Sequence, residues 1–171
     1  MTIRIRPAEP ADATAIAGVH GSAFPSDAEA RLVGALDRDG DALLSLVADR
    51  DGEIVGHVMF STMTVTAGEK SIPAAALAPV AVAPARQGAG IGSALIDHGL
   101  AALAERGIAY VFVLGEPGFY EQFGFDPLLG ARFASPYAGD YWMALALDGR
   151  APPRAGQARH ARAFDALGES Q

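Results

Sequence analysis

Cysteine is absent from this chain of 171 residues. The sequence therefore has no disulfide, no thiolate metal ligand and no cysteine nucleophile, and it fits a reducing compartment. Basic residues are also few, because 13 Lys and Arg stand against 20 Asp and Glu, for a formal net charge of −7. This balance argues against a nucleic-acid partner, since such binding relies on Lys and Arg at phosphates. A negative surface would attract a cationic substrate such as an amine, or simply keep the protein soluble.

A long apolar run is missing as well. The longest apolar stretch, 71–85, is too short to span a bilayer and contains Pro73, Pro79 and Pro84. The first 30 residues contain acidic residues where a signal peptide would have its apolar segment. We therefore expect a cytoplasmic protein with no membrane partner. Length and composition are typical of one globular domain, 1–171.

The first half of the chain has the pattern of two helices and an antiparallel meander. Ser26 followed by Glu29 predicts a capping box at the start of the second helix. Asp51-Gly52 is a strong hairpin signal between two alternating apolar segments. The expected elements are a strand at 3–6, helices at 12–20 and from 26, and strands at 44–50, 53–66 and 71–82.

The second half has the pattern of a strand–helix–strand unit. The helix expected at 90–106 has apolar residues on one face and Gly107 as its stop. The strand expected at 108–114 should then run parallel to the strand at 71–82. Another strand is expected at 141–147, and the tail at 149–171 either adds an edge strand around 159–164 or packs loosely.

Three alternating glycines precede this helix. Gly88, Gly90 and Gly92 let backbone N–H groups turn toward an anion, and the helix N-terminus adds a positive dipole end. The pattern suits a pyrophosphate, with Arg86 at the rim, or it merely caps the helix. A P-loop is excluded, because no Gly-Lys-Ser/Thr is present. A dinucleotide loop is disfavoured, because Ser93 replaces its third glycine and Pro79 in the preceding strand indicates an edge strand or a bulge.

The glycine loop and its neighbours resemble a known family. The segment 87–92, Gln-Gly-Ala-Gly-Ile-Gly, is similar to the Gln/Arg-x-x-Gly-x-Gly/Ala signature of the GNAT superfamily of N-acyltransferases. The segment 77–84 resembles the family's fourth strand, and 120–125 resembles its Tyr-x-x-x-Gly-Phe segment. Residues 114–120 and the late Ala-Phe-Asp at 163–165 resemble the YhbS-like bacterial subgroup. The resemblance covers about residues 1–148.

The resemblance implies a fold and a cosubstrate. The fold would be α/β, with a mixed, mostly antiparallel sheet of six to seven strands and about four helices. Strands 4 and 5 would splay apart in a V, and acetyl-CoA would bind there without a metal. Two sets of backbone amides would hold it. Those of Val80, Ala81 and Val82 would contact the pantetheine and thioester, and the pyrophosphate would lie on Gln87, Gly88, Ala89, Gly90, Ile91, Gly92 and Ser93.

The implied reaction is transfer of an acetyl group to an amine of a small molecule or peptide by direct attack. Tyr120 matches the family's general acid, although it could simply be an aromatic core residue. The strand at 71–82 lacks the glutamate that many members use as base. Glu116, just after the fifth strand, is therefore the candidate base or substrate anchor, or else a surface carboxylate. Glu29 is assigned to its capping box, with a substrate contact as the alternative.

Other functions fit the same residues. The missing glutamate is compatible with a non-catalytic acyl-CoA-binding module, and the scaffold with an O-acyl or longer-chain acyltransferase. The four histidines have no metal-ligand spacing, and we assign no metal residues. His57 could face the cleft or form hydrogen bonds within the sheet. Tyr137, Tyr141 and Trp142 either line the acceptor pocket or pack on the sheet. A homodimer is compatible with the family.

Overall fold

One long strand organises the molecule. In the computed structural model, which describes residues 2–169, β3 runs from Glu53 to Ala67 and pairs with four other strands. β2 (Ala42–Arg50) and β5 (Ala74–Val82) pair with its first part, in the predicted antiparallel meander. β4 (Lys70–Ile72) and β9 (Gly156–His160) pair with its last part.

The other strands extend this sheet at both sides. β1 (Ile3–Pro7) pairs with β2, and β6 (Tyr110–Leu114) lies between β5 and β8 (Trp142–Ala146), giving the order β1-β2-β3-β5-β6-β8. The short β7 (Phe133–Ala134) pairs with β9. Among the strands of the described residues, only the β5–β6 and β7–β9 pairs are parallel, so the predicted mixed, mostly antiparallel sheet is confirmed. Within residues 2–169 the sheet has nine strands, because β4, β7 and β9 are added around the end of β3.

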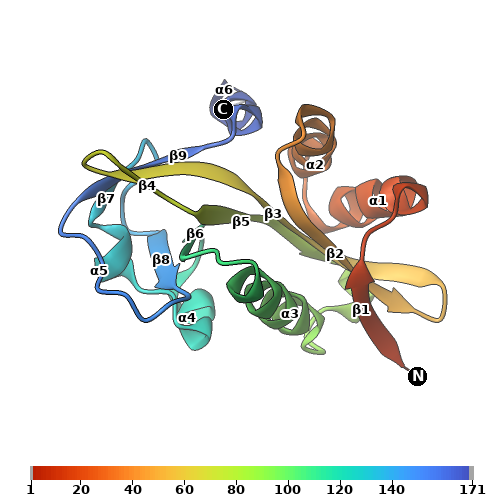
Figure 1. Cartoon of the computed structure of the whole chain (residues 1–171). Coiled ribbons are helices and arrows are strands. Elements are labelled where there is room, and N and C mark those ends of the chain that lie inside the picture. The colour runs from red at the N-terminus through yellow and green to blue at the C-terminus, as the bar shows by residue number, and fades with distance from the viewer. Residues whose placement is uncertain (1, 170–171) are drawn as a thin grey trace.

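Helices cover both faces of the sheet. α1 (Ala13–Ala23) and α2 (Ala28–Asp39) lie on one side, and α3 (Ile91–Glu105) lies on the other (Figure 1). α4 (Pro117–Tyr120), α5 (Pro127–Gly130) and α6 (Asp165–Glu169) have four or five residues each, so the described part of the chain has six helices where about four were expected. Short 3₁₀ turns occupy Pro10–Asp12, Pro84–Arg86, Glu121–Phe123 and Arg162–Phe164. No helix within residues 2–169 is long and apolar enough to cross a membrane.

The close packing of α3 on the sheet depends on two glycines. Gly99 of α3 lies so near Phe60 of β3 that a Cβ at residue 99 would overlap the phenylalanine ring. Gly56 of β3 faces Leu95 and Ile91 of α3, and a Cβ there would meet their methyl groups at 3.0 and 3.1 Å. These contacts bring the start of α3 against β5, where the glycine loop lies.

β5 and β6 separate after a short parallel pairing. Their register runs from Ala74↔Tyr110 to Ala76↔Phe112, and within residues 2–169 the rest of β5 has no strand partner on that side. The β3–β5 register also shifts between Val58 and Phe60, opposite Pro79, as a bulge does. The predicted splay is confirmed, and it leaves backbone groups of β5 available to a ligand.

Two local predictions were wrong. α2 begins at Ala28 and not at Ser26, because the Ser26 hydroxyl accepts a local bond from the Ala28 N–H at 3.2 Å, so the chain turns again before the helix. Asp27 is the N-cap, with no side-chain capping bond, so Glu29 does not complete a capping box.

The tail strand lies at Gly156–His160 and not around 159–164, since the chain then turns and buries Phe164 against the α2 side of the sheet.

Candidate active site

A cleft of about 400 Å³ opens at the start of α3. We call it the α3 cleft. Three segments and one further side chain line it, namely the end of β5, the glycine loop, the first turn of α3, and Phe119 from α4. The lining residues are Val80, Ala81, Val82, Arg86, Gln87, Gly88, Gly90, Ile91, Gly92, Ser93 and Phe119. The cleft therefore brings together every predicted cofactor-binding residue except Ala89, which is exposed in the loop.

The backbone of the loop explains two of its glycines. Gly88 has φ +80° and Gly90 has φ +83°, a left-handed conformation that other residues rarely adopt. Gly90 is the N-cap of α3, and its carbonyl accepts the first helical bond from Ala94 N at 3.0 Å. The backbone N–H groups in the first turn of α3 have no acceptor inside the helix, so the N-terminus of α3 can bind an anion. The Gln87 side chain donates to Val82 O at 2.9 Å and ties the loop to β5.

Tyr120 lies beside the α3 cleft. Its ring is half-buried and packs edge-on against Phe119, which lines the cleft, and against Phe125 of the core, with centroids 4.9 and 5.8 Å away. Gly115 gives it room, because a Cβ at residue 115 would overlap the Tyr120 ring. Burial raises the pKa of Tyr120 above its ordinary value, so the hydroxyl keeps its proton at neutral pH. Tyr120 itself is not among the residues that line the cleft.

Glu116 is exposed at the N-cap of α4. Its backbone carbonyl accepts bonds from Phe119 N and Tyr120 N at 3.1 Å each, while its side chain makes no capping bond. It lines neither the α3 cleft nor the other cavities described below. Its predicted role as base or anchor stays a prediction.

A second cavity, of about 210 Å³, lies where β5 and β6 separate. We call it the β5–β6 cavity. Its walls come from β5, β6, α2 and the C-terminal part of the chain. They are formed by Glu29, Leu32, Leu77, Ala78, Pro79, Phe112, Leu114, Tyr137, His160, Phe164 and Leu167. The α3 cleft begins at Val80, so the two spaces are bounded by consecutive residues of one strand.

Two polar residues of the β5–β6 cavity were not predicted to lie together. The sequence indicates a capping box or a substrate contact for Glu29, and His160 lies in a tail whose course the local pattern does not predict. Of the three aromatic residues proposed for an acceptor pocket, Tyr137 lines the cavity. Tyr141 is exposed, whereas Trp142 is buried and donates from Nε1 to Gly130 O at 2.9 Å.

His57 belongs to a buried hydrogen-bond chain. Its Nδ1 is 2.8 Å from His20 Nε2, and its Nε2 is 2.8 Å from Ser45 Oγ. Burial lowers the pKa of His20 to about 4 and that of His57 to about 3. His57 therefore forms hydrogen bonds within the buried interior, as one of the two alternatives predicted.

Among the described residues, no group of three or more His, Asp or Glu side chains could hold a metal ion.

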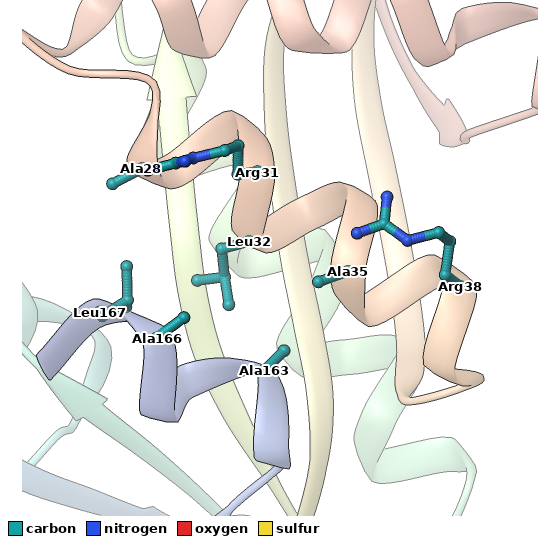
Figure 2. Close-up of a pocket in the computed structure, with 8 residues that line it drawn as sticks. All are labelled: Ala28, Arg31, Leu32, Ala35, Arg38, Ala163, Ala166 and Leu167. Atoms are coloured by element: carbon teal, nitrogen blue, oxygen red, sulfur yellow. The ribbon is translucent and has the colours of Figure 1, made fainter. Parts of the chain in front are cut away.

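A third hollow, of about 360 Å³, lies between α2 and the C-terminal turn and helix. Figure 2 shows its small apolar residues Ala163, Ala166 and Leu167 facing α2. Among the described residues, the polar side chains in this lining are Arg31 and Arg38 alone, so these residues offer no carboxylate, imidazole or hydroxyl for acid–base chemistry. The hollow is therefore a poor candidate for a catalytic site.

Known proteins share this architecture. A model of the acetyltransferase (GNAT) domain matches residues 4–128. The N-acetyltransferase YhbS of Escherichia coli is 42% identical over 123 residues, 71% of this chain and 72% of that protein. YjhQ of the same species, also named an N-acetyltransferase, is 41% identical over 130 residues, 74% of this chain and 71% of that protein.

Two crystal structures are similar over nearly the whole chain. That of E. coli YhbS, in complex with CoA, has a TM-score of 0.84 at 31% identity, covering 95% of this chain and 92% of that one. That of a GNAT family acetyltransferase from Brucella melitensis, in complex with acetyl-CoA, has a TM-score of 0.80 at 34% identity, covering 96% and 99%.

Proposed function

Because this chain belongs to the GNAT family of N-acetyltransferases, we propose that it transfers an acetyl group from acetyl-CoA to an amine of a small molecule or peptide. The observation that carries this proposal is the α3 cleft, which joins an anion-binding helix start to the unpaired edge of β5. CoA and acetyl-CoA in the two similar crystal structures support the same donor here.

The two ends of the cleft suit the two parts of the donor. The pyrophosphate would lie on the N–H groups from Gly88 to Ser93, where the helix dipole favours negative charge. Arg86 lines the same cleft and supplies a cation. The pantetheine would run along Val80–Val82, where β5 has left β6 and its N–H groups can meet amide and thioester carbonyls.

The chemistry needs no nucleophile from the protein. The amine nitrogen attacks the thioester carbon, the C–N bond forms, and the C–S bond breaks as the tetrahedral intermediate collapses. The nitrogen loses one proton, and the leaving thiolate gains one. An N–H of β5 directed at the thioester carbonyl would stabilise the oxyanion, a contribution of about 3–4 kcal/mol in acyl transfer.

Tyr120 is our candidate for the proton donor to the thiolate. Its hydroxyl is protonated at neutral pH, as the ordinary pKa of tyrosine already ensures, and burial raises the pKa of Tyr120 further. Its ring lies against Phe119, which lines the cleft. No carboxylate lines the α3 cleft among the described residues, so the base must be sought elsewhere.

The test is acetyl-CoA-dependent thiol release with a panel of amines, alcohols and peptides. Tyr120→Phe should lower kcat by about 100- to 1,000-fold, because general acid catalysis is lost. The Kd for acetyl-CoA should stay unchanged in calorimetry. Tyr141→Phe, which removes an exposed hydroxyl, is the matched control and should keep full activity.

Four results would contradict parts of this proposal. Failure to bind acetyl-CoA would overturn it entirely. Binding without acceptor-dependent release would favour the non-catalytic module. Release that depends on alcohols, or that is faster with longer acyl groups, would favour the O-acyl or longer-chain transferase. Full activity of Tyr120→Phe would remove Tyr120 from the mechanism while leaving the donor site intact.

A further inference from the structure

A fourth hollow, of about 300 Å³, lies beside the first residues of β6. We call it the β4–β6 pocket. Its walls come from the end of β3, from β4, from the start of β6 and from the segment 148–153 that follows β8. Its polar lining residues are Lys70, Tyr110, Asp148 and Arg150, and the other lining side chains are those of alanine, isoleucine and proline.

The β4–β6 pocket and the α3 cleft lie at opposite ends of β5. Tyr110 pairs with Ala74 at the start of that strand, whereas the cleft begins at Val80. Six residues of extended chain span about 20 Å. The two spaces also share no lining residue. The pocket is therefore separate from the site proposed for acetyl-CoA.

Tyr110 presents a polar group to the pocket from a buried ring. The residue is 3% exposed, and its ring packs in the core against Phe133, with the ring centroids 5.6 Å apart. Its hydroxyl has no hydrogen-bond partner among residues 2–169, and it is not fully enclosed, so it meets the pocket. The hydroxyl of a buried tyrosine usually has a partner. A ligand in the pocket would supply one.

The charges around this hydroxyl are not balanced. Burial raises the pKa of Tyr110 above its ordinary value, Asp148 raises it further, and Arg150 and Arg132 oppose the shift, so all three charges lie near the hydroxyl. Asp148 accepts from Arg150 at 2.8 and 2.9 Å, and these two charges largely cancel. Lys70 and Arg132 form no salt bridge among residues 2–169. The surroundings of the pocket therefore keep an excess of positive charge.

This positive charge is assembled from distant parts of the chain. Lys70 comes from β4 and Arg150 from the segment after β8. Arg132 donates to the carbonyl of Pro153, a lining residue, at 3.2 Å. In a chain with a formal net charge of −7, such a concentration of cations favours an anion. A cationic ligand would have to displace Arg150 from Asp148, the carboxylate of the lining.

The remaining wall is apolar, and the volume is at the lower end of the usual range for ligand sites, about 300–1,000 Å³. We propose that the β4–β6 pocket is a second ligand site, which binds a small organic anion with a carboxylate or phosphate group on a compact apolar body. The Tyr110 hydroxyl donates a hydrogen bond to the anion, and Lys70 supplies the opposite charge. Ile72 and Pro153 contact the apolar body.

Lys70 makes the test specific to this pocket, because it is the only lysine of the chain. The wild type is treated with N-hydroxysuccinimidyl acetate, and mass spectrometry follows the acetylation of Lys70. Phenylacetate or phenyl phosphate at ten times its Kd occupies about 90% of the sites, so this reaction should slow by about 5- to 10-fold. The more protective of the two identifies the head group. Phenyltrimethylammonium should give no protection.

Two variants test the named contacts by calorimetry of the same anions. Tyr110→Phe removes one hydroxyl and should keep the thermal unfolding temperature, while the anion Kd rises by about 5- to 10-fold. Lys70→Gln should raise the Kd by about 10-fold or more, because a charged hydrogen bond is lost. Tyr141→Phe and Arg4→Gln, at exposed positions outside the pocket, are the matched controls and should bind as wild type.

Several results would overturn the site. These are the absence of Lys70 protection by any anion, equal protection by phenyltrimethylammonium, or an unchanged anion Kd in a folded Tyr110→Phe. If that variant does not fold, an unchanged Kd in Lys70→Gln has the same meaning. Equal binding of inorganic phosphate and phenyl phosphate would leave the apolar wall without a role and contradict an organic ligand.

A competition experiment separates this site from the donor site. Phenylacetate binding that is lost when CoA saturates the protein would assign the anion to the α3 cleft and overturn the proposal. Binding that persists with CoA and depends on Tyr110 supports it. None of these measurements requires acetyl transfer, so their outcome is independent of the proposed function.

Discussion

Among the residues of the glycine loop, backbone conformation distinguishes glycines that look alike in the sequence. Gly88 and Gly90 have positive φ, and a Cβ at either would point into open space. Gly92 lies in the first turn of α3, where a Cβ would meet Val82 at 3.6 Å, an ordinary contact. The first two are therefore needed for the turn of the chain, whereas the third is not.

Gly90→Ala should reduce the free energy of unfolding by about 1–2 kcal/mol, because a side chain disfavours the left-handed conformation. The acetyl-CoA affinity should fall as well, since relief of the strain would turn the first N–H groups of α3 away from the cleft. Urea unfolding and calorimetry measure the two effects. Gly92→Ala is the matched control and should be neutral or stabilising by up to about 1 kcal/mol. If Gly90→Ala and Gly92→Ala reduced the free energy of unfolding equally, this distinction between the two glycines would be refuted.

At the scale of elements, the α3 cleft depends on how closely α3 approaches β3. Gly99 and Gly56 remove side chains from the contact, which lets Phe60, Leu95 and Ile91 fill the space between helix and sheet. The helix start is thereby held beside the end of β5, and the proposed pyrophosphate and pantetheine sites become parts of one cleft.

Gly99→Ala should destabilise the protein by about 1–3 kcal/mol, although alanine is the better helix former, because the new methyl group overlaps Phe60. Thermal or urea unfolding measures the loss. Gly18→Ala in α1, where a Cβ meets nothing within 4 Å, should stabilise by about 1 kcal/mol. In a Phe60→Leu background, Gly99→Ala should reduce the free energy of unfolding by less than in wild type. An equal reduction in both backgrounds would show that overlap with Phe60 is not the cause.

At the scale of the whole molecule, buried histidines tie stability to pH. The pKa values of His20, His57 and His160 are lowered by burial to about 4, 3 and 4. Above an unfolded pKa near 6.5 each histidine is neutral in both states, and its contribution is fully present. As pH falls below that value, the unfolded chain binds protons that the folded protein excludes, so stability decreases.

Between pH 7 and pH 5 the free energy of unfolding should fall by up to about 2 kcal/mol for each of these histidines. Asp12, whose pKa is lowered to about 2 by Arg6, contributes stability that is present throughout this range and is lost only as pH falls below the ordinary value of 3.8. Urea unfolding at several pH values measures the slope. His20→Gln should make the slope shallower, whereas His98→Gln, at an exposed position, should not. A wild-type stability that is constant from pH 7 to pH 5 would contradict the prediction.

Most of the fold followed from local patterns. The Asp51-Gly52 hairpin, the helix that ends before Gly107 and the bulge at Pro79 are each encoded within a few residues, and the structure confirms them. The tail was misplaced because the pairing of β9 with β3 joins residues about a hundred positions apart. A local pattern contains no information about such a partner.

The candidate site likewise has one part that the sequence predicts and one part that it does not. The anion-binding loop is determined by the sequence itself, because glycine conformation and helix polarity act between neighbouring residues. The β5–β6 cavity was decided only by the tertiary structure. Glu29 comes from α2, Pro79 from β5 and His160 from β9, and they meet because helix, sheet and tail pack together. Whether a carboxylate is exposed or enclosed without a partner depends on that packing, and so does the chemistry it can perform.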